Sequence, residues 1–412
     1  MASGLLEIDE ARRLVLGPVT PLAPERVELD GALGRTLAED VRAEEAVPAF
    51  DNSAMDGFAV RAADVARAAP GTPLVLSVVA ESRAGSPARE ALGPGQAIAI
   101  STGAMLPDGA DTIVPVEDAC LRDGQLEIRS SSPAGRHVRL AGDDVRAGQT
   151  VLGRGAVLGA AELGALASLG RREVECARRP RVSLLVSGDE LLMPGDPPRS
   201  GAIHDSNSLT VGALARLGGA SVVRSAAVED DAAATAEALA AALRDVDVTV
   251  VCGGVSVGRH DHVRPILETL GARRVFWGIA LKPGRPTWFG TLDSTLVFGL
   301  PGNPVSAMVA FVLLVRPALR ALLGAPTQVP SLTAVMDRAY RKPAGRAHAL
   351  RCRISAREDG WHAEPAVNQG SHVLTSMLGA DALALIPSDT VDVQAGERVA
   401  IEPLRPWIGA HA

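Results

Sequence analysis

The feature that most constrains the fold is the alternation of short apolar runs with helical stretches between residues 181 and 324. The apolar runs are RVSLLVS (181–187), ASVVRSAAV (220–228), VDVTVVC (246–252) and STLVFGL (294–300). The stretches between them are helical in composition, as in DSNSLTVGALARLG, where Asp205 or Ser206 is a candidate N-cap and Gly218 a stop. Strands that alternate with helices build a parallel sheet with crossover helices on its faces. The sequence therefore predicts a central α/β domain.

The last helix expected in this segment is very apolar. Asn303 is its expected N-cap and Pro304 its first residue, a position where the missing N–H has no cost. The run Val305–Val315 is apolar apart from one serine, and Pro317 is expected to kink the helix. The run ends at Arg316 after 11 residues, well short of the roughly 20 residues that span a bilayer. We expect a buried core helix.

Both flanks of the α/β segment differ from it in pattern. Residues 46–146 alternate polar and apolar positions between turns such as ALGPGQ and LPDGAD, which is typical of a β-rich domain. Residues 326–406 also read as short strands, separated by KPAG, REDG and QAGE, without a convincing helix. Residues 151–178 contain a short helix in a glycine-rich context that would suit a hinge. The predicted fold class is thus a multidomain combination of α/β and β parts.

Composition excludes several classes of protein. Against 41 Lys plus Arg stand 48 Asp plus Glu, so a net charge of -7 leaves no surplus that would attract a nucleic acid. The four cysteines form no CxxC pair, which disfavours both a disulfide scaffold and structural zinc. The N-terminal MASGLLEIDEARR has acidic residues directly after a very short apolar stretch, unlike a secretory signal. We expect a cytoplasmic protein.

Four polar loops follow expected strands of the α/β segment: Ser187–Glu190, Gly253–Gly258, Lys282–Pro286 and Pro301–Pro304. Ligands of an open parallel sheet bind at the edge formed by the carboxyl ends of its strands. Glycines let backbone N–H groups approach an anion closely, and a helix N-terminus adds favourable partial charge. GGVSVG alone is as readily a structural turn, but four such loops at one edge favour a phosphate or oxyanion site. These loops match neither GxGxxG nor GxxxxGK, the dinucleotide and P-loop patterns.

Charged residues in these loops suggest a metal and an anion. Glu190 and Asp261 are candidate ligands of magnesium, which prefers oxygen atoms and commonly bridges to substrate phosphates. Alternatively, Glu190 caps or ion-pairs with a neighbouring helix, and Asp261 is a helix N-cap. Lys282 and Arg285 are the only cations of the KPGRP turn and could hold an oxyanion, although an ordinary solvated turn is the alternative.

A second group of small polar residues, Phe50–Val60, lies between apolar flanks in the β-rich part. The spacing of these residues alone predicts a turn-rich loop, in which Asn and Asp side chains cap their own turns. Ser101–Ala104 and Gly142–Asp144 are likewise ordinary turns by themselves. The residues alone do not assign these three segments a function.

Eight segments spread over nearly the whole chain do carry a resemblance. They are PAFDNSAMDGFAVR (48–61), STGAMLPDGAD (101–111), SGDEL (187–191), HDSN (204–207), GGVSVGRHD (253–261), KPGRP (282–286), LPGNPVSA (300–307) and NQGSH (368–372). In sequence and in order they resemble the motifs of the MoeA family, the molybdopterin molybdenumtransferases, to which the E domain of gephyrin is related. Chance agreement of so many motifs is negligible.

The resemblance implies a function in molybdenum cofactor biosynthesis: insertion of molybdate into adenylylated molybdopterin, with Mg²⁺-dependent release of AMP. The catalytic residues that it implies are Asp56, Thr102, Asp144, Glu190, Asp230, Asp261 and Lys282, of which Glu190 and Asp261 would hold the metal. The implied residues that bind the pterin nucleotide and the anion are Ser187, Gly188, Asp205, Asn207, Gly253, Gly254, Ser256, Gly258, Lys282, Arg285, Pro301, Gly302, Asn303, Pro304 and Ser371.

The resemblance also implies an arrangement of domains and subunits. The domains would be an α/β molybdopterin-binding domain (1–24 plus 179–325), a linking domain (25–43 plus 149–178), a β-rich small domain (44–148) and a C-terminal β domain (326–406). The resemblance implies an elongated homodimer, in which the site combines the α/β domain of one subunit with the small domain of the other. An adenylyltransferase and a molybdoenzyme would be further partners, and neither nucleic acid nor membrane would be one.

Two positions depart from the family pattern. Gly278 stands where many members carry a lysine, and Arg285 replaces the second lysine of the KPGKP turn. A lost cation weakens an oxyanion site unless Arg273, Arg274 or Arg285 compensates. The missing lysine leaves one alternative function open, a non-catalytic molybdopterin carrier or scaffold. A second alternative is the adenylylation step, which uses a similar α/β domain alone; the added β-rich and C-terminal domains argue against it.

Overall fold

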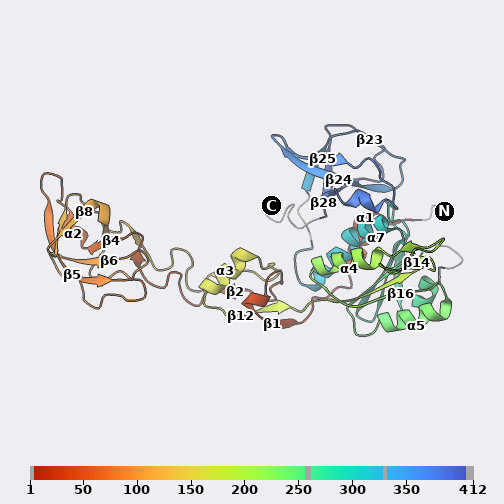
Figure 1. Ribbon diagram of the computed structural model, residues 1–412, viewed down its shortest axis with the longest axis horizontal. Coiled ribbons are helices and arrows are strands. Elements are labelled where there is room, and N and C mark those ends of the chain that lie inside the picture. Colours follow the sequence, from red (N-terminus) through yellow and green to blue (C-terminus); the bar gives the residue numbers. More distant parts are fainter. Residues whose placement is uncertain (1–3, 256–260, 328–331, 405–412) are drawn as a thin grey trace.

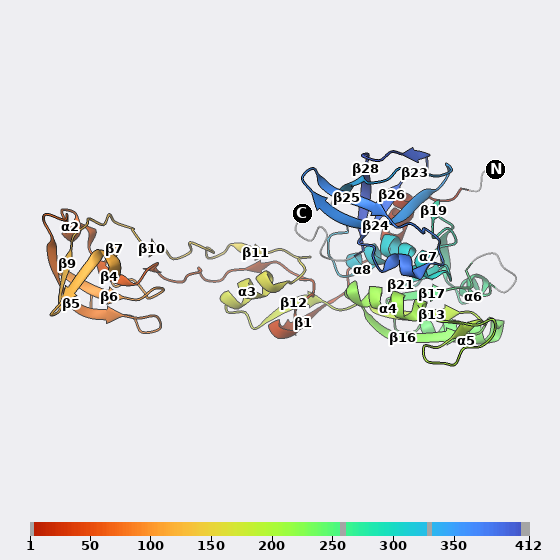
Figure 2. The ribbon, with the colours of Figure 1, turned by 45° about the horizontal axis from the view of Figure 1, so that its top comes forward.

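The computed structural model describes residues 4–255, 261–327 and 332–404 of the chain. The molecule is elongated, with a β-rich part at one end, a slim connecting part, and the central sheet together with a second β part at the other end (Figures 1 and 2). The chain passes through the connecting part twice, once on the way to the β-rich end and once on its return. Residues of the two ends are therefore far apart within one chain.

The central sheet has six strands in the order β16-β13-β17-β21-β20-β18. Four of them are parallel neighbours, as the alternation predicted: β13 (Arg181–Ser187), β16 (Ser221–Val228), β17 (Val248–Cys252) and β21 (Thr295–Leu300). Two antiparallel strands that the sequence analysis did not predict, β20 (Trp288–Leu292) and β18 (Arg273–Trp277), extend the sheet. The α/β fold is confirmed, but its sheet is mixed rather than wholly parallel, because β20 and β21 form a hairpin.

Helices cover both faces of this sheet, because successive residues of a strand point to opposite sides. On one face, Leu184 packs in a cluster with α1 (Ile8–Leu16), α4 (Asn207–Leu217) and α7 (Pro304–Ala310). On the other face, Leu185 packs with α5 (Ala232–Ala242) and α6 (Val263–Thr269). The N-terminal helix thus shares a core with residues far later in the chain.

The apolar helix α7 continues into a π-helical segment, η3 (Phe311–Val315), and then into α8 (Arg316–Leu322). Pro317 has no N–H to donate to the carbonyl of Leu313, four residues earlier; Arg12 Nε donates to that carbonyl instead, at 2.9 Å. The stretch Pro304–Leu322 has the length and mean hydropathy (1.8) of a membrane span, but 72% of its apolar window is buried inside the protein. It is a core helix, as expected, and it extends beyond the apolar run.

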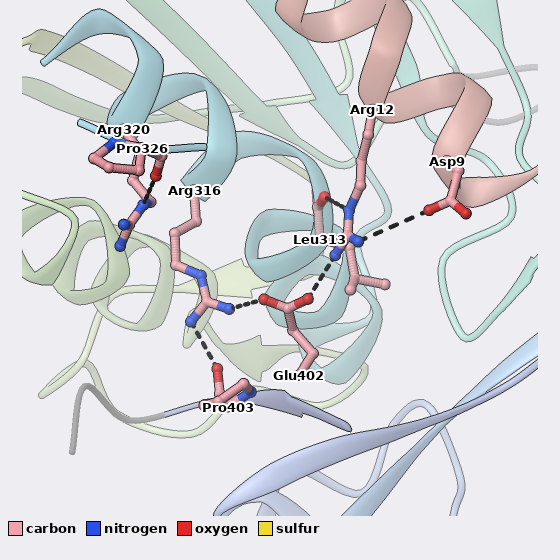
Figure 3. A network of polar contacts seen from close by, with 8 residues as sticks. All are labelled: Asp9, Arg12, Leu313, Arg316, Arg320, Pro326, Glu402 and Pro403. Atoms are coloured by element: carbon pink, nitrogen blue, oxygen red, sulfur yellow. Dashed lines mark hydrogen bonds and ion pairs between the residues drawn. The ribbon is translucent and has the colours of Figure 1, made fainter. Parts of the chain in front are cut away.

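The charge of Arg316 at the end of this run is neutralised by a shared carboxylate (Figure 3). Arg316 Nη2 donates to Glu402 Oε1 at 2.5 Å, and Arg12 Nη2 donates to Glu402 Oε2 at 2.7 Å. Arg316 also donates to the carbonyl of Pro403 at 2.7 Å. Burial lowers the pKa of Arg316, and the Glu402 carboxylate opposes this shift. These contacts join α1, α8 and the last strand, β28 (Arg398–Pro403).

The C-terminal part is a small closed sheet with its own apolar core. It closes because β24 pairs with both β25 and β26. A short strand from the α/β segment, β19 (Leu281–Lys282), pairs with β24 in parallel and so joins the two parts. The elements of this part are β22 (Leu332–Met336), β23 (Tyr340–Arg341), β24 (Ala347–Arg357), β25 (Gly360–Pro365), η4 (Leu374–Met377), β26 (Ala382–Ile386), β27 (Asp392–Val393) and β28.

The β-rich end holds a six-stranded sheet in the order β7-β4-β6-β5-β9-β8. Its elements are β3 (Asn52–Ser53), β4 (Gly57–Val60), α2 (Ala62–Val65), β5 (Leu74–Ser82), β6 (Gln96–Ile100), β7 (Thr112–Pro115), η2 (Val116–Asp118), β8 (Ala119–Arg122), β9 (Gln125–Ile128) and β10 (Val138–Arg139). The connecting part consists of β1 (Pro24–Glu28), η1 (Leu29–Gly31), β2 (Val41–Arg42), β11 (Thr150–Leu152), α3 (Ala160–Ser168) and β12 (Glu173–Ala177). The four domain boundaries given above stay a prediction.

Removing the shared carboxylate should weaken the packing of α1, α8 and β28 against one another. We expect Glu402→Ala to lower the free energy of unfolding by about 3 kcal/mol, because it leaves the half-buried Arg316 without a counter-charge and Arg12 with only the exposed Asp9, 4.0 Å away. Thermal unfolding followed by calorimetry measures the effect. Glu10→Ala is the matched control, since it breaks the exposed pair with Arg13 on the same helix and should change little. A Glu402→Ala protein that melts like the wild type would contradict this role.

Candidate functional site

The loops that follow β13, β17 and β21 meet at the carboxyl edge of the parallel strands. The N–H of Gly253 donates to the carbonyl of Leu300 at 3.0 Å. A Cβ on Gly253 would lie 2.4 Å from the carbonyl oxygen of Ser187, and a Cβ on Gly302 would lie 3.7 Å from Gly253 Cα. Gly253 and Gly254 also have φ angles of +94° and +64°, which favour glycine. The structure thus brings together the SGDE, GGVSVG and PGNP loops, and at position 253 only glycine permits so close an approach to Ser187.

Carboxylates surround this edge. Ser187 Oγ donates to Asp230 Oδ1 at 2.5 Å, and the N–H of Asp230 donates to Asp189 Oδ1 at 2.8 Å. The carboxylate of Glu190 lies over Gly188, where a Cβ would be 2.6 Å from Oε2. Glu190 is exposed, and its carboxylate makes no hydrogen bond or ion pair with any residue that the structure describes. The helix-capping alternative for Glu190 therefore has no support in the described part of the chain.

Asp261 lies at the other end of the GGVSVG motif, half-buried, just before α6. The N-cap of that helix is His262 rather than Asp261, and it makes no side-chain capping bond. Ser256 and Gly258 lie outside the described residues. Within the described ranges, no three His, Cys, Asp or Glu side chains gather as a metal would need. A metal at this edge would therefore depend on ligands from the substrate as well.

A cavity of about 750 Å³ opens beside these carboxylates. This volume is typical of sites for small molecules. Arg199 helps to shape it, because its Nη2 donates to the carbonyl of Asp189 at 3.0 Å. The lining residues are Gly188, Asp189, Leu191, Leu192, Asp196, Pro197, Pro198, Arg199, Ala227, Val228 and Glu229. The sequence analysis missed most of them, since the loop between β14 (Leu191–Leu192) and β15 (Ile203–His204) has no motif of its own.

Asp205 and Asn207 form the support beneath the PGNP loop. Asp205 Oδ1 accepts from the N–H groups of Asn207 and Ser208, at 2.8 and 3.2 Å, at the start of α4. Asn207 Nδ2 donates to the carbonyl of Gly302 at 2.7 Å. The buried Asp205 Oδ2 and Asn207 Oδ1 have no hydrogen-bond partner among the described residues. Asn207 thus holds the loop in which Pro301 is buried and Pro304 begins α7, and Asp205 fixes the start of the helix that carries Asn207.

Ser371 reaches the same loop from the C-terminal part, since Asn303 Nδ2 donates to its Oγ at 3.3 Å. The Ser371 loop is held by Arg351, which is fully buried. Arg351 Nη2 donates to the carbonyls of Asn368 and Gly370, at 3.2 and 3.1 Å. Burial lowers the pKa of Arg351. Sequence reasoning missed Arg351, because nothing local signals a bond to a loop some twenty residues later.

Lys282 lies on β19, so the C-terminal part sets its position. It is paired in register with His348 of β24. His348 is buried, with Nδ1 2.8 Å from the Tyr340 hydroxyl oxygen. Burial, and then the charges of Lys282, Lys342 and Arg346, lower the pKa of His348 to about 4. The imidazole is therefore neutral near pH 7 and adds no competing charge beside the exposed Lys282. The KPGRP turn thus belongs partly to the C-terminal sheet, whereas the sequence analysis placed it directly after a strand of the central sheet.

The structure gives a reason for glycine at position 278. Gly278 has φ +87°, and a Cβ there would lie 2.9 Å from Leu5 Cδ2. Its N–H donates to the carbonyl of Thr287 at 2.8 Å, which fixes the backbone. A lysine at this position would be strained by the positive φ, and the Leu5 side chain would have to shift. The exposed Arg285 lies in the adjoining turn, where its carbonyl accepts from the N–H groups of Ile279 and Thr287.

A separate group of predicted residues lies in the β-rich end. Asp56 Oδ1 accepts from the N–H and the hydroxyl of Thr102, at 2.7 and 3.0 Å. These hydrogen bonds lower the pKa of Asp56. A cavity of about 660 Å³ adjoins them, lined by Val47, Pro48, Phe50, Asn52, Gly103, Arg139, Asp143 and Asp144. Sequence reasoning missed Arg139, whose only signal is a cation five residues before Asp144.

The structure does not bring these two groups together within one chain. Asp56, Thr102 and Asp144 belong to the β-rich end, whereas Glu190 and Asp261 belong to the opposite end of the molecule (Figure 1). The connecting part separates them in both views (Figure 2).

Comparison with known proteins matches three family models to the chain in order. They are the MoeA N-terminal region (domain I and II) at residues 6–170, the probable molybdopterin binding domain at 183–321 and the MoeA C-terminal region (domain IV) at 333–404. The molybdopterin molybdenumtransferase of Haemophilus influenzae is 37% identical over 98% of this chain and 100% of its own. That of Bacillus subtilis is 33% identical over 98% of this chain and 96% of its own.

A solved structure agrees with these sequence relatives. The molybdopterin biosynthesis MoeA protein of Pyrococcus horikoshii OT3 superposes with a TM-score of 0.83 at 29% identity, covering 97% of this chain and 99% of that one. The mixed sheet with its glycine-lined edge thus defines a molybdopterin-binding class of protein. Within that class, the chain belongs to the MoeA family, as the eight motifs implied.

The close approach of Gly253 to Ser187 can be tested against a glycine that lacks a close neighbour. We expect Gly253→Ala to lower the free energy of unfolding by about 3 kcal/mol, of which about 1 kcal/mol is backbone strain and the rest overpacking. Gly195→Ala is the matched control, because Gly195 has φ +101° but nothing within 4 Å of its Cβ position; it should cost about 1 kcal/mol. Urea unfolding followed by tryptophan fluorescence measures both. Equal losses would contradict the packing argument.

Proposed function

We propose that this protein is a molybdopterin molybdenumtransferase that inserts molybdate into adenylylated molybdopterin and releases AMP in a Mg²⁺-dependent reaction. The observation that carries the proposal is the meeting of three glycine-containing loops and several carboxylates at one sheet edge, beside a cavity of about 750 Å³. Relatives that match the chain over nearly its full length and bear the name molybdopterin molybdenumtransferase support it.

Phosphate and pterin would bind at this edge. The peptide N–H groups of Gly254 and Gly302 would be the donors to an anion, since that of Gly253 already donates to the carbonyl of Leu300. The buried acceptors of Asp205 and Asn207 would suit the N–H donors of a bound heterocycle if the loop above them yields. Lys282, beside the neutral His348, supplies a positive charge for molybdate or phosphate oxygens. Ser371 and Asn303 add neutral hydrogen-bonding groups at the PGNP loop.

The donor set of this edge fits magnesium. Mg²⁺ commonly takes one or two protein carboxylates, and substrate phosphates and water complete its shell. Glu190 and Asp261 would supply the carboxylates, since Glu190 is exposed and its carboxylate is unengaged among the described residues. Asp230 already accepts a short hydrogen bond from Ser187, which suits it to orient that hydroxyl rather than to hold the metal. When bound, Mg²⁺ would neutralise the charge that develops on the phosphate during cleavage.

A homodimer would complete the site. One chain keeps Asp56, Thr102 and Asp144 far from Asp261, so a second copy must supply one of the two groups if all act together. The hydrogen bonds from Thr102 keep the Asp56 carboxylate ionised and fixed in orientation. It would then be ready to orient a nucleophile at the neighbouring subunit's sheet edge.

Release of AMP tests the proposal directly. The purified protein, given adenylylated molybdopterin, molybdate and Mg²⁺, should release AMP, and Glu190→Ala or Asp261→Ala should slow release at least about 100-fold. Glu237→Ala is the matched control, because it removes an exposed carboxylate from α5 of the same domain. No AMP release by the wild type at any molybdate concentration would contradict the function. Wild-type turnover by both site variants would contradict the metal assignment.

The same assay separates two other functions. A molybdopterin carrier, favoured by the missing lysine at position 278, would bind the pterin nucleotide without releasing AMP. An adenylylating enzyme would consume ATP and molybdopterin in the absence of molybdate.

A further inference from the structure

One aromatic side chain contacts both ends of the segment that carries Asp261. Trp277 is the last residue of β18, and its indole Nε1 donates to the carbonyl of Val255 at 3.0 Å. The guanidinium carbon of Arg264 lies 4.4 Å from the centroid of the same ring. Val255 precedes Asp261 by six residues, and Arg264 follows it by three. The indole therefore makes a polar contact before Asp261 and a stacking contact after it.

Both contact points are firmly anchored. Val255 is only 2% exposed and lies in the apolar cluster of the second sheet face. A Cβ on Gly299 would lie 2.7 Å from Val255 Cγ1, so the Val255 side chain packs on the end of β21. Arg264 lies on α6, whose Val263 packs against Gly254, where a Cβ would be 2.6 Å from Val263 Cγ2. The indole thus connects two well-packed positions, Val255 and Arg264, to the strand β18.

Trp277 also directs the chain towards the KPGRP turn. The next residue, Gly278, is held by the hydrogen bond to Thr287 and by the contact with Leu5. Lys282 follows only five residues after Trp277. A shift of the indole would therefore move both Asp261 and the turn that carries Lys282.

We propose that Trp277 is a positioning residue that sets the place of Asp261 relative to Glu190 and the substrate, with Arg264 as its stacking partner. The inference rests on the proposed function, in which Asp261 holds Mg²⁺. Tryptophan suits this role because it combines a flat face for the guanidinium with an N–H donor. Phenylalanine keeps the face and loses the donor, and lysine at 264 keeps the charge and loses the planar stack.

Variants that remove one contact at a time test the role. We expect Trp277→Phe to raise the Mg²⁺ concentration for half-maximal AMP release by about 10-fold, the usual cost of losing a partner that orients a metal ligand. Arg264→Lys should raise it by about 3-fold. Trp361→Phe makes the same chemical change in the C-terminal part, where Trp361 is 39% exposed, and should leave it unchanged. Calorimetric titration of AMP in the presence of Mg²⁺ should show the same order of weakening.

The two readouts separate this inference from the proposed function. If the wild type releases no AMP, the proposed function fails, and Mg²⁺-dependent AMP binding then tests Trp277. Wild-type Mg²⁺ dependence in Trp277→Phe, with activity lost only in proportion to folded protein, would show a merely structural role and overturn the inference. If Trp277→Phe does not fold, Arg264→Lys decides: an unchanged Mg²⁺ requirement overturns the inference, and a raised one supports it.

Discussion

The carboxylate of Glu402 is shared by two guanidinium groups from widely separated parts of the chain. The arrangement of the α/β and C-terminal parts, which carry Glu190 and Ser371, depends on it. Arg12 comes from the first helix and Arg316 from the start of α8, while Glu402 itself belongs to the last strand. Its side chain is only 12% exposed, so both ion pairs are partly shielded from water. Because removing Glu402 would leave the half-buried Arg316 without a counter-charge, this carboxylate holds the three segments together.

That union has consequences for the site. The C-terminal part supplies Ser371 to the PGNP loop, and through β24 it sets the register of Lys282. Leu5 precedes the first helix, which carries Arg12, and its side chain packs against Gly278. The positions of the PGNP loop and the KPGRP turn are therefore determined by the first and last parts of the chain as well as by the central sheet.

Much of the fold could be predicted from sequence because its signals are local. Four parallel strands and their helices follow from apolar runs that alternate with capped helical stretches, and the PGNP helix begins at Pro304 as its composition indicates. The antiparallel strands β18 and β20 were missed because each is only five residues long and is fixed by its pairing with another part of the chain. The roles of His348 and Arg351 could not be predicted from sequence either, because their partners are distant in sequence. The glycine loops were recognisable as a possible anion site, but only the structure reveals the backbone contacts that require glycine at position 253.

The elongated chain leaves a single decisive question about the proposed mechanism, which is whether Asp56 of one subunit acts with Asp261 of another. Two subunits with different affinity tags, one carrying Asp56→Ala and the other Asp261→Ala, can be co-expressed and purified as a mixed dimer. Each parent homodimer should fail to release AMP, whereas the mixed dimer contains one intact composite site and should show about half of the wild-type rate. A mixed dimer as inactive as its parents, beside a fully active wild-type dimer with the same tags, would contradict a site shared between two chains.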